Sequence, residues 1–120
     1  DIAQALIGLG ELACKIAAGQ GSWATAQPAD VTLICPLVIG RRANDPAWER
    51  AEDWIGAFEK SSVLSSAIQM AGEAVNLRVV DGNLFGCSSE HDPIHWTEDT
   101  HVKFGAGMAS FFQKQVFGKT

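Results

Sequence analysis

The chain has 120 residues, of which 47% are hydrophobic and 19% are charged, and its formal net charge is −5. This length allows at most one domain, and the hydrophobic content is typical of a globular protein with a core. The modest negative charge and the lack of a basic patch argue against a nucleic-acid partner. No apolar run approaches the length of a membrane span.

Cysteine usage and the first residues bear on the compartment. Cys14, Cys35 and Cys87 are odd in number and widely spaced, so they indicate neither a disulfide framework nor a thiolate metal site. Free thiols favour a reducing compartment, and we expect a cytoplasmic location. The first residues show no signal-peptide pattern. The chain opens with Asp1 and not with an initiator methionine, so we expect a cut, a processed end or an imposed boundary there.

The first half of the chain predicts a helix, a loop and a buried strand. Apolar residues at helical spacing predict the helix over residues 2–18. Its apolar stripe consists of Ile2, Leu6, Leu9, Ala13, Ile16 and Ala17. A loop carrying Trp23 follows. Residues 31–35 are continuously apolar and end at Pro36, which is typical of a strand buried on both faces of a parallel sheet.

The second half predicts further helices and one short strand. Residues 37–46 form a loop that ends in an Asn-Asp-Pro turn. An apolar stripe starts in residues 47–58 and continues to Val75, which predicts one long helix, or two helices with a break near Ser61 and Ser62. A strand is expected at residues 77–80 and a loop at 81–91. The last helix is expected over 98–116, with an apolar face of Val102, Ala106, Ala109, Phe112 and Val116.

The residues best suited to catalysis lie just before this last helix. Asp92 and His95 are three residues apart in a loop held by Pro93, and Thr97 is a good helix N-cap. A carboxylate bonded to one ring nitrogen fixes the histidine tautomer, so the other nitrogen can take a proton. The pair is therefore a candidate catalytic base with its orienting acid. Spacing alone favours an incidental surface turn, because such short patterns arise by chance.

The stretch Asp92-Pro93-Ile94-His95-Trp96 before a closing helix resembles the last sequence block of the SGNH (GDSL-type) hydrolases, a family of serine esterases and lipases. The likeness extends backwards over most of the chain. Residues 30–37 resemble the family's buried strand that ends in proline, and residues 59–61 and 76–81 resemble the start of its next helix and its next strand. Only the family's C-terminal half is covered, and small bacterial acyl- and arylesterase-like members are the most similar.

The resemblance implies a three-layer α/β/α sandwich of the flavodoxin-like SGNH hydrolase type, with a parallel sheet. It implies hydrolysis of small acyl or carboxylic esters without a cofactor, with His95 as the base and Asp92 as its orienting acid. Ile94 and Trp96 are candidate substrate-pocket residues, although Trp96 is equally suited to the core under the last helix. We expect a homo-oligomer.

The expected nucleophile has no match in the sequence. No serine lies in a Gly-Asp-Ser or Gly-x-Ser-x-Gly setting. Two parallel strands also cannot shield the apolar faces of three or four helices, since sheets this small are marginal. We therefore expect the chain to be the C-terminal half of a single hydrolase domain, inactive alone. A missing N-terminal segment or a second chain would supply the serine.

Two other readings remain open. The chain could be a non-catalytic α/β interaction module, because a fold does not imply a function. A metal-dependent hydrolase using His91, His95 and Asp92 is the other alternative, since His-x-x-x-His is a spacing of metal ligands on one helix face. Pro93 lies between the two histidines and disfavours a helix there, so no metal site is expected.

Overall fold

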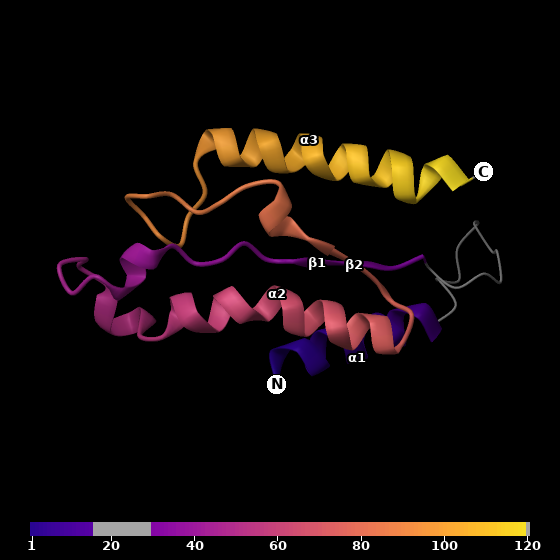
Figure 1. Ribbon diagram of the computed structural model, residues 1–120, viewed down its shortest axis with the longest axis horizontal. Coiled ribbons are helices and arrows are strands. Elements are labelled where there is room, and N and C mark those ends of the chain that lie inside the picture. The colour runs from indigo at the N-terminus through magenta and orange to yellow at the C-terminus, as the bar shows by residue number, and fades with distance from the viewer. Residues whose placement is uncertain (16–29, 120) are drawn as a thin grey trace, which may run out of the picture. The chain divides into compact units, whose positions relative to one another are not determined.

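The computed structural model describes residues 1–15 and 30–119 (Figure 1). Within them, the α-helices are α1 (Ile2–Lys15), α2 (Ala57–Ala74) and α3 (Glu98–Gln115), and the strands are β1 (Thr32–Cys35) and β2 (Arg78–Asp81). Short 3-10 helices are η1 (Arg41–Asn44), η2 (Ala51–Trp54), η3 (Gly82–Leu84) and η4 (Phe117–Lys119). The chain divides into two compact units. Unit 1 comprises Asp1–Cys35 and Leu64–Asp81, and unit 2 comprises Pro36–Val63 and Gly82–Thr120.

Unit 1 is built on the two strands. They pair in parallel, from Thr32 opposite Arg78 to Cys35 opposite Asp81. The helix α1 and the second part of α2 lie along this pair, on the same side in Figure 1. The core of the unit contains Ala3, Cys35 and Ile68, with Leu6, Leu64 and Val79 packed around them. The predicted strand positions and the α/β class with a parallel sheet are confirmed.

The buried face of α1 differs from the predicted stripe. Ala3, Ile7 and Gly10 are buried, whereas Ile2 is 66% exposed and Leu9 is 63% exposed. The reason is close packing at Gly10, where a Cβ atom would lie 2.5 Å from Leu77 Cδ2. A pattern of apolar side chains does not reveal a glycine whose role is to let a neighbouring side chain approach the helix backbone. Residues 16–18 of the expected helix and the loop carrying Trp23 lie outside the described residues.

The expectation that β1 is buried on both faces is wrong for one residue. Cys35 is fully buried, but Ile34 is 43% exposed. Neighbouring side chains of a strand point to opposite faces, so Ile34 lies on the face opposite Cys35. Its partner Val80 shares that face and is only 4% exposed, so this face is covered unevenly. The continuous apolar sequence of β1 therefore exceeds what the described residues cover.

The helix expected over residues 47–58 is also wrong in its first part. Residues 51–54 form η2, and the chain then turns at Gly56, whose φ of +73° favours glycine. The helix α2 begins after this turn and runs without a break through Ser61 and Ser62. Both serine hydroxyls donate to the carbonyl oxygen of Phe58, at 3.0 and 2.7 Å, so they are accommodated inside the helix.

In unit 2, α3 begins where the sequence predicts. Its N-cap Thr97 accepts the N–H of Thr100 at Oγ1 over 3.2 Å. The buried face is not the predicted one, because Thr100 and Met108 are buried while Val102 is 66% exposed. Gly107 lies against the ring of Phe85, so the helix face is again set by a glycine. No helix in the described part of the chain is long and apolar enough to cross a membrane.

Candidate functional site

The candidate site lies in unit 2, in the loop that leads into α3. His95 Nδ1 and Asp92 Oδ2 are 2.6 Å apart, within hydrogen-bond distance. Asp92 Oδ1 accepts the backbone N–H of Ile94 over 3.1 Å, so one carboxylate serves both the ring and the local turn. The structure thus brings together the two residues that the sequence singles out as an acid and base pair.

Ser89 also holds this loop in place through hydrogen bonds to its backbone. Its backbone N–H donates to the carbonyl oxygen of His95 over 3.0 Å. Its Oγ accepts the backbone N–H groups of His91 and Asp92, at 3.2 and 3.3 Å. These bonds hold the backbone on both sides of Asp92, so they restrain the position of its carboxylate. The role of Ser89 is structural in this geometry, because its hydroxyl oxygen and its N–H both serve the backbone of the loop.

The loop is anchored to the segment after β1. Pro93 is fully buried, and its carbonyl oxygen accepts the backbone N–H of Gly40 over 2.8 Å. A Cβ atom on Gly40 would lie 2.9 Å from Ser88 Oγ and 3.0 Å from Pro93 Cβ. The two segments therefore touch backbone to backbone at this point.

Charge and exposure favour an ionised Asp92 beside an accessible histidine. The hydrogen bond from His95 is the main cause that lowers the pKa of the Asp92 carboxyl, and the N–H of Ile94 adds to it. The side chain of His95 is 70% exposed. Among the described residues, its Nε2 has no hydrogen-bond partner. A neutral imidazole held in this way presents a proton acceptor to the solvent side.

The other predicted site residues take different positions. The ring of Trp96 packs on α3, with centroid distances of 5.0 Å to His101 and 4.9 Å to Phe104. Ile94 is half-buried in the loop. Whether either residue contacts a substrate stays a prediction.

Among the described residues, the histidines do not belong to a group that could hold a metal ion. Within residues 1–15 and 30–119, no three His, Cys, Asp or Glu side chains come together in a way that could hold a metal ion, and this includes the set of His91, His95 and Asp92. Cys14, Cys35 and Cys87 are free thiols. Burial raises the pKa of the Cys35 thiol, which makes it a packing residue rather than a nucleophile.

Sequence reasoning missed a pocket of about 310 Å³ beside the loop. It is lined by Gly40, Arg41, Arg42, Ser88, Ser89 and Glu90. The residues come from two segments that are distant in the sequence, and no local pattern connects them. The available signal in the sequence was the pair of arginines that follows Gly40, which marks a local positive charge.

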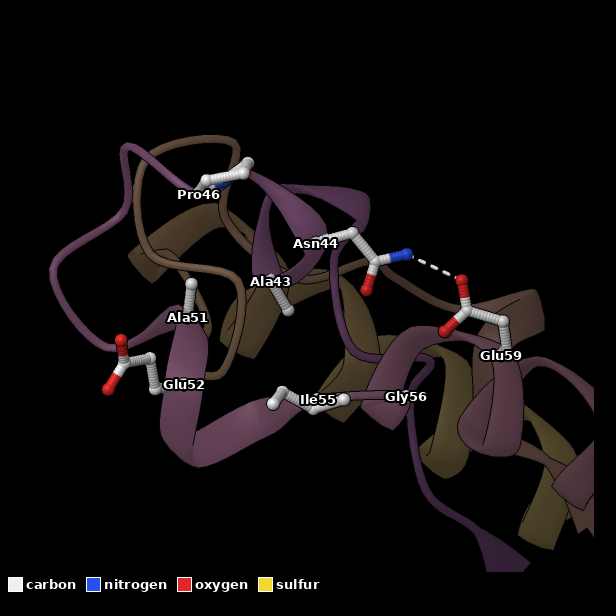
Figure 2. A pocket seen from close by; sticks show the side chains of 8 residues that line it. All are labelled: Ala43, Asn44, Pro46, Ala51, Glu52, Ile55, Gly56 and Glu59. Carbon is white, nitrogen blue, oxygen red and sulfur yellow. Dashed lines mark hydrogen bonds between the residues drawn. The ribbon is translucent and has the colours of Figure 1, made fainter.

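A second pocket in unit 2, of about 410 Å³, lies between η1, η2 and the start of α2 (Figure 2). Ala43, Pro46, Ala51 and Ile55 give it an apolar lining. The Asn44 amide donates to the Glu59 carboxylate at one side of the pocket, as the dashed line in Figure 2 shows. Two carboxylates border the pocket, those of Glu52 and Glu59, and this bond occupies the one of Glu59.

Two solved structures resemble the chain. A carbohydrate acetylesterase from Sinorhizobium meliloti matches with a TM-score of 0.77 and 21% identity, over 94% of this chain and 50% of that one. An aryl esterase from M. smegmatis matches with a TM-score of 0.79 and 21% identity, over 97% of this chain and 52% of that one. The chain thus has the α/β fold of these esterase structures and spans about half their length. No protein-family model and no curated protein sequence matches it.

Proposed function

We propose that this chain carries the general base of a serine-type hydrolase that acts on small acyl or carboxylic esters. His95 is the base and Asp92 is the carboxylate that orients it. The observation that carries the proposal is the 2.6 Å contact between Asp92 Oδ2 and His95 Nδ1, made by a histidine whose side chain is 70% exposed. The likeness of the fold to two esterases, and of the sequence to the SGNH hydrolases, supports ester hydrolysis over other uses of such a pair.

The chemistry follows from the two ring nitrogens. Nε2 takes the proton of a serine hydroxyl while the serine oxygen attacks the ester carbonyl. The resulting imidazolium is stabilised by the ionised Asp92 at Nδ1. It then returns the proton to the leaving alkoxide, which leaves an acyl-enzyme. A water deprotonated by the same nitrogen then attacks the acyl carbonyl. The bond to the serine oxygen breaks, that oxygen takes the proton back from Nε2, and the carboxylic acid leaves. Backbone N–H donors that stabilise the oxyanion complete the site.

We propose that the serine and the oxyanion donors come from another segment of polypeptide, either an N-terminal segment or a second chain. The covered share of the two esterases is consistent with this, because the matched part is about half of each. Exposed apolar residues of unit 1 also suit a further packing partner, for example Ile34 at 43% and Leu9 at 63% exposure. The chain alone would then not hydrolyse esters.

The test is labelling with a fluorophosphonate, which reacts with an activated serine, followed by intact-mass spectrometry. We expect this chain to stay unlabelled, and the polypeptide that supplies the serine to gain one label when the two are together. Labelling should be lost in His95→Ala, since the serine is then no longer activated. Equal labelling with and without His95 would overturn the assignment, and absence of any label in the complete protein would favour a non-catalytic module.

A further inference from the structure

The pocket beside the histidine loop is the feature that the proposed chemistry does not use. It measures about 310 Å³, at the lower end of the range for small-molecule sites. One side consists of Gly40, Arg41 and Arg42, and the other of Ser88, Ser89 and Glu90. All six residues belong to unit 2.

This pocket shares its walls with the candidate catalytic loop. Ser89 lines the pocket and donates its N–H to the carbonyl oxygen of His95, and Gly40 lines it and donates to that of Pro93. A group bound there would therefore contact residues whose backbone bonds directly to the loop that carries the imidazole. The position suits the distal part of a molecule whose reacting part faces His95.

The lining is positively charged in a chain of negative net charge. Arg41 and Arg42 contribute two cations and Glu90 one anion. Among the described residues, neither guanidinium forms an ion pair with a carboxylate. The Arg41 guanidinium lies over the ring of Phe58, with its Cζ 4.5 Å from the ring centroid, a contact that restrains this side chain without neutralising its charge.

We propose that this pocket binds the free carboxylate of an ester substrate, such as a monoester of a short dicarboxylic acid. The inference rests on the proposed function. The guanidinium fork of an arginine matches the two oxygens of a carboxylate, and such charge-assisted bonds are stronger than neutral ones. The hydroxyls of Ser88 and Ser89 border the same space and suit a short polar chain. Glu90 opposes the anion and sets a limit on its affinity.

Binding can be measured without hydrolysis. The full chain is titrated with succinate, and with succinamide as the uncharged ligand of similar shape, while NMR follows the amide signals of Gly40, Ser88 and Ser89. We expect saturable shifts with succinate and none with succinamide. Arg42→Gln should weaken succinate binding by about tenfold, and Glu90→Gln should strengthen it by about twofold.

Arg50→Gln is the matched control, because it changes the net charge equally at an exposed arginine that pairs with Asp53 outside the pocket. A similar weakening in Arg50→Gln and Arg42→Gln would mean a diffuse electrostatic effect and would overturn the site. Equal binding of succinate and succinamide would also overturn it.

In the complete enzyme, the substrate role is tested with 4-nitrophenyl hemisuccinate and 4-nitrophenyl acetate. The ratio of kcat/KM for the anionic ester to that for the neutral ester should fall by about tenfold in Arg42→Gln. An unchanged ratio would overturn the substrate role. Intact succinate binding without hydrolysis of either ester would instead count against the proposed function alone.

Discussion

Gly40 donates its backbone N–H to the carbonyl oxygen of Pro93 over 2.8 Å, and this bond fixes the histidine loop to the segment that follows β1. The backbone of Gly40 has φ −61° and ψ 147°, a conformation open to any residue. The glycine is therefore required by space alone. A Cβ atom there would lie 3.1 Å from Pro93 Cα and 2.9 Å from Ser88 Oγ.

Gly40→Ala should consequently lower the free energy of unfolding by about 1–3 kcal/mol, the usual cost of an extra methyl group in a packed site. Urea denaturation followed by tryptophan fluorescence measures this change. Gly105→Ala is the control in the same unit, because a Cβ atom on that helical residue meets nothing within 4 Å. We expect it to raise the free energy of unfolding by about 0.5–1 kcal/mol. Equal effects of the two substitutions would contradict the close contact.

The second prediction concerns the pKa of Asp92. The hydrogen bond from His95 is the main cause that lowers this pKa, so His95→Ala should raise it towards the ordinary aspartate range. NMR titration of the side-chain carboxyl carbon measures the change. His91→Ala is the control, since the groups that lower the pKa are His95 and the N–H of Ile94. An Asp92 pKa that does not change in His95→Ala would show that the pair does not form in solution.

The same shift has a consequence for stability, with a defined sign. Because the pKa of Asp92 is lower in the folded chain than in the unfolded one, the pair stabilises the folded chain above the unfolded-state pKa. This contribution is lost as the pH falls through the folded-state pKa. The difference in unfolding free energy between the parent chain and Asp92→Asn should therefore shrink as the pH falls through this range.

Much of this geometry was accessible from local sequence, because it depends on neighbours in the chain. Thr97 as a helix N-cap, and Asp92 with His95 around a proline, act over three residues, so both contacts are possible within the local chain. The family resemblance, rather than the spacing, favoured the Asp92 and His95 pair. The parallel strands were likewise indicated by their apolar runs. The proposal of esterase chemistry comes from the family resemblance, and it stays a prediction together with the roles of Asp92 and His95.

Contacts between distant segments were not accessible in the same way. Gly40 meets Pro93 through backbone atoms, which leave no trace in a pattern of side chains. The buried faces of α1 and α3 were assigned to apolar residues, whereas Gly10 and Gly107 mark the surfaces of closest approach. The arginine pocket was missed for the same reason, since residues 40–42 and 88–90 are brought together only by folding.

The third prediction tests the start of α3. Thr97 Oγ1 accepts the N–H of Thr100, and its hydroxyl also donates to Thr100 Oγ1, which in turn donates to the carbonyl oxygen of Cys87 over 2.9 Å. Thr97→Ala should cost about 1 kcal/mol of unfolding free energy, as is usual for loss of an N-cap. Thr97→Ser retains the hydroxyl and should stay close to the parent chain. Equal destabilisation in both variants would show that the methyl group matters and the cap does not.

The fourth prediction addresses catalysis in the complete enzyme, with 4-nitrophenyl acetate as the substrate. His95→Ala should lower kcat by at least about a hundredfold, because general base catalysis contributes that much or more. Asp92→Asn should also lower kcat strongly but leave more activity, since its amide oxygen can still accept the N–H of Ile94 and keep the turn. Retained activity in His95→Ala would exclude the histidine as the base.

His91→Ala distinguishes the proposed mechanism from the metal-dependent alternative, in which both histidines are ligands. We expect this variant to retain most of the activity, because Nδ1 of His95 is held by Asp92 and not by His91. Two results together would favour the metal-dependent mechanism. The first is an equal loss of activity in His91→Ala and His95→Ala. The second is loss of the parent enzyme's activity on chelation and its recovery on addition of zinc. The two readings therefore predict opposite outcomes at one residue, next to the carboxylate that they share.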